Sequence, residues 1–153
     1  MIKTTLYSQR DTRWSAMYLG FSKLRIGSFG CTITSIANML SAFGYNETPA
    51  TVNTKLKAVG GFSGALVIWT AVSKVWPKAQ FVKRALNFNN VEVAWYVYGK
   101  QIPVIVKVHA PQIGALNHWV LYVGDRKMVD PWTGKIVPTS TYGAEAYALY
   151  NKA

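Results

Sequence analysis

Three residues of this sequence are of the types that carry out covalent catalysis by a thiol. They are the single cysteine, Cys31, a histidine that opens a predicted strand, His118, and an aspartate at the end of the next strand, Asp130. Thiol catalysis needs a nucleophile, a base that takes its proton and a group that orients the base. A lone cysteine is most often a small buried apolar side chain, so the role of Cys31 depends on the elements around it.

Cys31 lies at the start of a predicted helix, directly after Gly30. From residue 31 to residue 43 apolar side chains recur at spacings of three and four, the helix period, and Gly44 provides a C-terminal stop. The free N–H groups and the dipole at a helix N-terminus favour a thiolate. This position raises the expectation that Cys31 is a nucleophile.

His118 opens a predicted strand over 118–123, and Asp130 ends the next one, over 126–130. A turn at Gly124-Asp125 makes the two strands a hairpin, which brings these two strand ends together. Asp130 is then expected to accept a hydrogen bond from the imidazole of His118. The alternative interpretation is a polar residue that borders a loop and an ordinary Asp-Pro turn.

A second histidine, His109, is the alternative base. It ends the preceding predicted strand, so it is expected near the same end of the sheet as His118. Its neighbours Ala110-Pro111 are typical of a turn, and no acid follows at a comparable spacing. We therefore expect His118, rather than His109, to serve as the base.

The elements that must position these residues change in type halfway along the chain. Helices are predicted over 31–43, 48–59 and 64–75, and strands over 102–108, 118–123, 126–130, 134–138 and 146–150. Helices followed by antiparallel strands predict an α+β fold with the helices packed on one face of the sheet. No linker, repeat or low-complexity stretch divides residues 1–153, which predicts a single domain.

The composition is that of a folded and strongly basic chain. Of the 153 residues, 50% are hydrophobic and 15% are charged, which excludes a disordered protein. The 17 Lys and Arg against 6 Asp and Glu give a net charge of +11. This charge favours an anionic partner such as a cell-wall polymer, an anionic membrane surface or a nucleic acid. Because no RNA-binding motif is recognisable, nucleic acid is the least favoured of the three.

The cysteine and histidine counts limit the metal chemistry. One cysteine and two histidines exclude an internal disulfide framework, a multi-cysteine zinc or iron–sulfur site and a three-histidine metal site. We therefore expect neither a metal nor another cofactor.

The sequence also predicts no transmembrane segment. The N-terminal residues contain no apolar segment typical of a secretory signal. The most apolar window, 64–76, contains Lys74 and is about 13 residues long, whereas a membrane span needs roughly 20. We expect synthesis in the cytoplasm, with action at the bacterial cell wall after release.

Five fragments of the chain, in order, carry a family resemblance. They are Tyr7-Ser8-Gln9-Arg10-Asp11, Gly30-Cys31-Thr32-Ile33-Thr34, Gln101-Ile102-Pro103-Val104, Asn117-His118-Trp119-Val120-Leu121 and Asp130-Pro131-Trp132. Together they resemble papain-like cysteine peptidases, in particular the branch related to the bacteriocin-leader (double-glycine leader) peptidases. The resemblance extends from about residue 6 to residue 133, nearly the whole chain.

The resemblance implies a papain-like cysteine peptidase fold and a role for each matched residue. Cys31 would be the nucleophile, His118 the general base and acid, Asp130 the orienting carboxylate and Gln9 a donor to the oxyanion. Two features depart from the family. Gln9 lies 31 − 9 = 22 positions before Cys31, a longer interval than in the family, so the intervening loop must fold back. Thr32 occupies a position that is often Gly in the family.

The expected function is therefore amide hydrolysis by a Cys-His-Asp triad. Among the tryptophans, Trp119 is expected to shield the site beside the base, and Trp14 and Trp132 to line it. A small basic chain without a signal resembles a peptidoglycan-cleaving lysis enzyme, such as a phage endolysin-like endopeptidase or amidase. The alternatives are a peptidase that processes leaders or proteins, and a catalytically inactive papain-like domain that binds anionic polymers.

Overall fold

The structure is a computed structural model that describes residues 1–153, with the side chain of Leu116 outside the description. Its helices are α1 (Ile26–Phe29), α2 (Cys31–Ala42), α3 (Pro49–Ala58), α4 (Ala71–Val75), α5 (Asn90–Ala94) and the π-helix η1 (Trp95–Gly99), with 3₁₀ turns η2 (Pro111–Ile113) and η3 (Thr139–Thr141). Its strands are β1 (Phe62–Ser63), β2 (Leu66–Val67), β3 (Ala79–Ala85), β4 (Val104–Ala110), β5 (Ala115–Gly124), β6 (Lys127–Asp130), β7 (Lys135–Pro138) and β8 (Gly143–Lys152).

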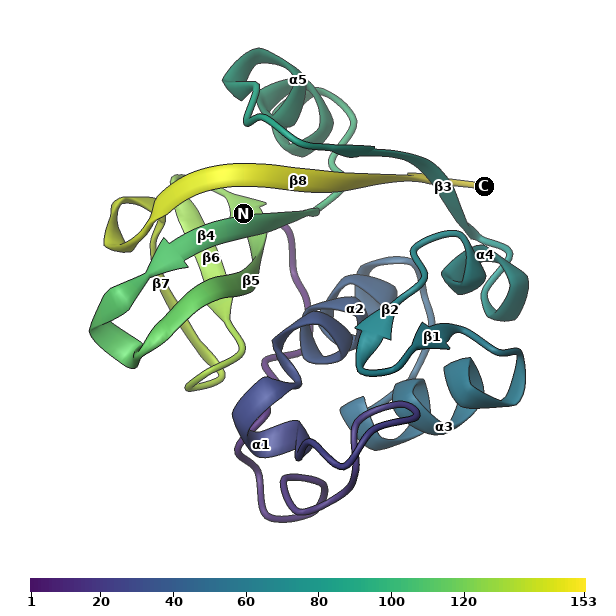
Figure 1. The fold of residues 1–153 in the computed structure, drawn as a ribbon. Helices are drawn as coiled ribbons and strands as arrows, with labels where there is room; N and C mark the ends of the chain where they lie inside the picture. Colours follow the sequence, from purple (N-terminus) through teal and green to yellow (C-terminus); the bar gives the residue numbers. More distant parts are fainter.

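The predicted α+β arrangement is confirmed. Strands β3 to β8 form one antiparallel sheet in the order β3-β8-β4-β5-β6-β7, and the N-terminal helices pack against it (Figure 1). The last strand, β8, lies between β3 and β4, so the C-terminal segment joins the edge strand β3 to the rest of the sheet. Among the described residues, no helix combines the length and apolar character that spanning a bilayer requires.

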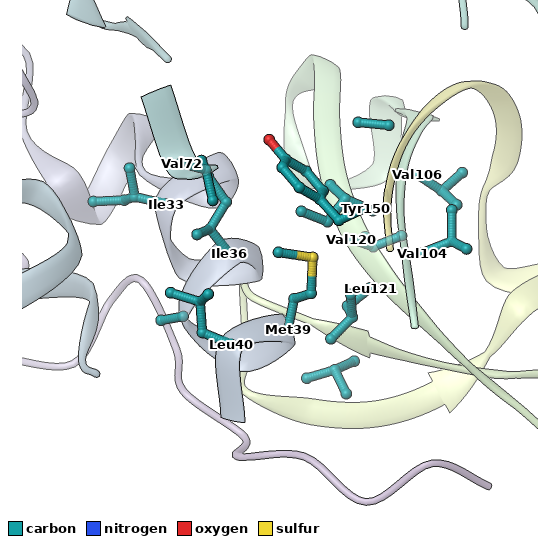
Figure 2. Packing of buried hydrophobic residues seen from close by; sticks show 14 of the residues in the cluster. Ile33, Ile36, Met39, Leu40, Val72, Val104, Val106, Val120, Leu121 and Tyr150 are labelled. Carbon is teal, nitrogen blue, oxygen red and sulfur yellow. The ribbon is translucent and has the colours of Figure 1, made fainter. Parts of the chain in front are cut away.

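Helix α2 is the element that joins the two layers. Its residues Ile36 and Met39 are fully buried, and Met39 lies next to Leu121 of β5 (Figure 2). The Ser35 hydroxyl donates a hydrogen bond to the Trp119 carbonyl at 3.1 Å, which fixes the helix against the strand that carries His118. The predicted start of this helix at Cys31 and its stop at Gly44, whose φ is +89°, are confirmed.

The second predicted helix is also confirmed, as α3. Thr48 is its N-cap, and the Thr51 N–H donates to the Thr48 hydroxyl at 3.2 Å. The Thr51 side chain reciprocates by accepting from the Thr48 N–H at 2.8 Å. This capping box, with Pro49 at the first helical position, starts the helix by purely local contacts.

The helix predicted over 64–75 is confirmed only over its last part, α4, and is wrong before it. Residues 62–67 form the hairpin β1–β2 around Gly64, whose φ is +61°, and helix begins only at Ala71. A short apolar run cannot be assigned to helix or strand by periodicity alone. The run shows no single apolar face, and its apolar residues are not all buried, since Leu66 is 74% exposed.

The strands predicted in the second half are confirmed, with shifted ends, and the turn at Gly124-Asp125 is present with positive φ at both residues. Strand β3 and helices α5 and η1 were not predicted. Most side chains of β3 are exposed or half-buried because it is an edge strand, so no alternating pattern marks it.

We expect Gly30, the residue before Cys31, to be intolerant of a side chain. An added Cβ would lie 2.6 Å from both Cγ2 and the carbonyl oxygen of Ile26, which is fully buried. Gly30→Ala should therefore lower the free energy of unfolding by about 1–3 kcal/mol in urea titrations, the usual cost of overpacking. Gly143→Ala is the matched control, because an added Cβ there meets nothing within 4 Å. Equal stability of the two variants would contradict the expectation.

Candidate active site

Cys31, His118 and Asp130 come together from three elements. Cys31 is the first residue of α2, His118 lies on β5 and Asp130 ends β6. His118 Nε2 lies 2.8 Å from Asp130 Oδ1, and both side chains are buried. The Cys31 thiol is close enough to His118 to help raise the pKa of the imidazole. Because Nε2 faces Asp130, Nδ1 is the ring nitrogen left for the sulfur.

Three donors surround the Asp130 carboxylate. Besides His118, the Tyr142 hydroxyl donates to Oδ2 at 2.6 Å and the Trp132 N–H donates to Oδ1 at 2.9 Å. Burial alone would raise the pKa of Asp130, but the hydrogen bonds from His118, Tyr142 and Trp132 outweigh it and hold this pKa below its ordinary value. Asp130 is therefore a carboxylate at neutral pH. Tyr142 was not among the residues expected from the sequence, and no sequence signal near it indicated this contact.

His118 binds its proton more tightly than a free histidine. Burial opposes the charged form, yet hydrogen bonds with Asp130 and Cys31, together with their negative charges, raise the pKa of His118 to about 9. The imidazole is therefore protonated at neutral pH, between a carboxylate and a sulfur. Such an arrangement can hold an imidazolium–thiolate pair.

Gln9 links the segment after Asp130 to α1. Its backbone N–H donates to the Pro131 carbonyl at 2.7 Å, and its side-chain Nε2 donates to the Gly27 carbonyl at 3.2 Å. The intervening loop does fold back, since the Gly27 N–H donates to the Ser15 carbonyl at 2.9 Å. The Gln9 side chain is buried, and its Oε1 has no hydrogen-bond partner among the described residues.

A cleft of about 430 Å³ opens at Cys31. The hairpin β1–β2, which contributes Leu66, forms part of its wall, and Trp69 and Trp119 lie in it with ring centroids 4.9 Å apart. Thr32 also lines the cleft, next to Cys31. Cys31 is 8% exposed and is one of the residues that line this space.

The three tryptophans expected near the site have different environments. Trp119 lines the cleft. Trp14 is buried in the core, where its indole N–H donates to the Ser8 carbonyl at 2.8 Å. Trp132 is half-buried beneath the Arg10 guanidinium, which lies 4.4 Å from its ring centroid. Of the three, Trp119 is the residue whose position suits contact with a substrate beside Cys31.

The alternative base, His109, stands apart from this group. It is exposed on β4, and its Nδ1 lies 3.7 Å from Glu145 Oε1. Burial and hydrogen bonding therefore distinguish His118 from His109, as the sequence spacing of the acids suggested.

The comparisons with known proteins add no assignment. No protein-family model matches the chain, and neither the curated proteins nor the solved structures give a significant match. Among the described side chains, no group of three or more His, Cys, Asp or Glu residues could hold a metal ion. The argument for a function therefore depends on the geometry around Cys31.

Proposed function

We propose that this protein is a papain-like cysteine peptidase that hydrolyses an amide bond through Cys31, His118 and Asp130. One observation carries the proposal: His118 is buried, is hydrogen-bonded to the Asp130 carboxylate and is close to Cys31, which lines a cleft. Burying a titratable pair is costly unless the pair is well hydrogen-bonded, and such strongly perturbed groups concentrate at catalytic sites. A purely structural role would not require that Cys31 line a cleft.

The proposed reaction is acyl transfer to the sulfur. The Cys31 thiolate attacks the carbonyl carbon of the substrate amide, and a tetrahedral oxyanion forms. His118 then gives its proton to the leaving nitrogen, the C–N bond breaks and a thioester remains. Water, with His118 now acting as base, hydrolyses the thioester and restores the thiol.

Asp130 and Gln9 have supporting roles in this reaction. Asp130 holds Nε2 of His118, so that Nδ1 exchanges the proton with the sulfur and with the leaving group. The proposed donors to the oxyanion are the backbone N–H of Cys31 and the side-chain amide of Gln9, which contacts α1 at Gly27.

The proposed substrate is the peptide portion of peptidoglycan, as in phage endolysin-like lysis enzymes. The net charge of +11 supports attraction to an anionic cell wall. Clearing of permeabilised bacterial cells, compared with cleavage of a denatured protein, separates this substrate from a protein-processing role. Clearing should weaken as salt is added, because salt screens the attraction.

The pH dependence of Cys31 alkylation by iodoacetamide tests the proposal directly. We expect the native thiol to react well below the ordinary thiol pKa of about 8.5, with a further rise in rate near pH 9 as His118 loses its proton. His118→Ala should abolish the reaction on the acid side, whereas His109→Ala should leave the profile unchanged. A native Cys31 that reacts only after denaturation would refute the catalytic role.

A further inference from the structure

Two positively charged side chains line the cleft and have no role in the proposed Cys-His-Asp triad. Arg84 on β3 and Lys107 on β4 both line the cleft that contains Cys31. Among the described side chains, no carboxylate lies within ion-pair distance of Arg84, and Lys107 has only a long contact of 3.9 Å between its Nζ and Glu145 Oε2. No Asp or Glu side chain is among the residues described as lining the cleft.

The sheet register explains why the two cations lie together. In β8, Ala148 is opposite Arg84 and Ala146 is opposite Lys107. Directly opposed residues point to the same face, as do residues two apart in one strand. The side chains of Arg84 and Lys107 therefore lie on the same face of the sheet. On β8 between them, the residues opposite the two cations are the alanines, whose side chains are single methyl groups.

The Arg84 guanidinium is held in place by two contacts. It lies 4.8 Å from the ring centroid of Trp119, the residue after His118, and it donates to the Ala85 carbonyl at 2.7 Å. Burial lowers the pKa of Arg84 from its ordinary value, because part of its hydration is lost without a counter-charge. A substrate anion would provide that counter-charge.

Other side chains that line the cleft are apolar and exposed to solvent. Leu24, Phe29 and Leu66 line it and are 41%, 54% and 74% exposed. Large apolar side chains that remain exposed around a cleft favour a ligand with apolar groups. The cleft is therefore lined both by exposed apolar side chains and by two cationic side chains.

We propose that Arg84 and Lys107 form a subsite for a carboxylate of the substrate, so that the preferred substrate is a peptide with an apolar side chain and an acidic group near the scissile bond. This inference rests on the proposed function, because it assumes that the cleft at Cys31 binds the substrate. Arg84 is the principal contact, since Lys107 already has Glu145 nearby. A guanidinium binds a carboxylate through two parallel hydrogen bonds.

A matched pair of alkylating reagents tests this subsite without knowledge of the scissile bond. N-iodoacetyl-glutamic acid α-amide carries the carboxylate, and N-iodoacetyl-glutamine α-amide is its neutral isostere. With either reagent, a bond forms between the Cys31 thiolate and the reagent methylene, iodide leaves and the proton remains on His118. The measured quantity is the ratio of the two second-order rate constants, at physiological salt, where the Debye length is about 8 Å.

We expect the native protein to prefer the glutamate reagent by about tenfold, within the range of one charge-assisted hydrogen-bonded contact. Arg84→Gln should bring the ratio close to that of a free thiol, and Arg84→Lys should restore part of the preference. Arg126→Gln is the matched control, because it removes the same charge from an exposed turn outside this cleft. Its ratio should remain that of the native protein.

The possible results separate the two proposals. A ratio that is unchanged by Arg84→Gln, or that falls equally in Arg126→Gln, would overturn the subsite while Cys31 still reacts. If neither reagent modifies native Cys31 but both modify the denatured chain, the proposed function itself fails. Circular dichroism of Arg84→Gln and Arg84→Lys identifies any loss of folding, and the conservative variant then provides the deciding ratio.

Two sources could supply this substrate chemistry, and competition distinguishes them. A soluble stem peptide of peptidoglycan and an acidic peptide of ordinary protein sequence are each added during alkylation of Cys31 by neutral iodoacetamide. Stronger protection by the stem peptide supports the subsite and identifies the cell wall as the source. Stronger protection by the acidic protein peptide supports the subsite with a protein substrate, and protection by neither contradicts it.

Discussion

The Cys31→Ser variant is expected to lose the ability to clear permeabilised bacterial cells. Replacing the sulfur by a hydroxyl leaves a much weaker nucleophile, and loss of a catalytic-triad nucleophile lowers turnover by roughly 10⁴-fold or more. The substitution is nearly isosteric, so the thermal unfolding temperature should change little. The assay is the initial rate of turbidity loss, with the denatured-protein assay run in parallel.

Comparison with other variants makes this result specific. His109→Ala removes a histidine that is exposed and lies outside the proposed triad, so it should retain full activity. If Cys31→Ser remained as active as the native protein, the alternative of a catalytically inactive domain that binds anionic polymers would be favoured. Binding of the variant to isolated cell walls should persist, because that attraction depends on the net charge of +11.

Asp130→Asn is expected to produce the second large effect, a fall in turnover of roughly 10²–10⁴-fold. The asparagine side chain keeps the shape of the residue but removes the charge that holds the His118 imidazole in orientation and protonation. The pKa of His118 should fall, so the acid side of the Cys31 alkylation profile should shift to higher pH. Turnover and alkylation are measured on the same protein preparation.

The same variant should alter how stability depends on pH. Because the pKa of His118 is raised from 6.5 to about 9 in the folded protein, its stabilising contribution is complete below about pH 6.5 and is lost as the pH rises through about 9. Urea titrations of the native protein should show this decline, and Asp130→Asn should reduce it. Asp125→Asn, at an exposed position on the β5–β6 turn, is the matched control and should behave as the native protein. A native stability that does not change between these pH values would contradict the proposed ion pair.

Local sequence alone determined the elements that hold the proposed triad. The helix period from Cys31, the stop at Gly44 and the turn at Gly124-Asp125 act over a few residues. They therefore predicted that Cys31 begins a helix and that His118 and Asp130 meet across a hairpin, where the structure has them 2.8 Å apart.

Tertiary structure alone decided how the rest of the chain surrounds these residues. Strand β3 pairs with β8, more than 60 positions later, and only this non-local pairing brings Arg84 to the cleft. Tyr142 reaches Asp130, and Gln9 reaches Pro131, by contacts that no periodicity predicts. Within 64–75, the first residues belong to a hairpin that borders the cleft, whereas Ala71 and Val72 are buried in α4. Hydrophobic periodicity indicates which face of an element is buried, and it contains no information on the distant segment that buries it.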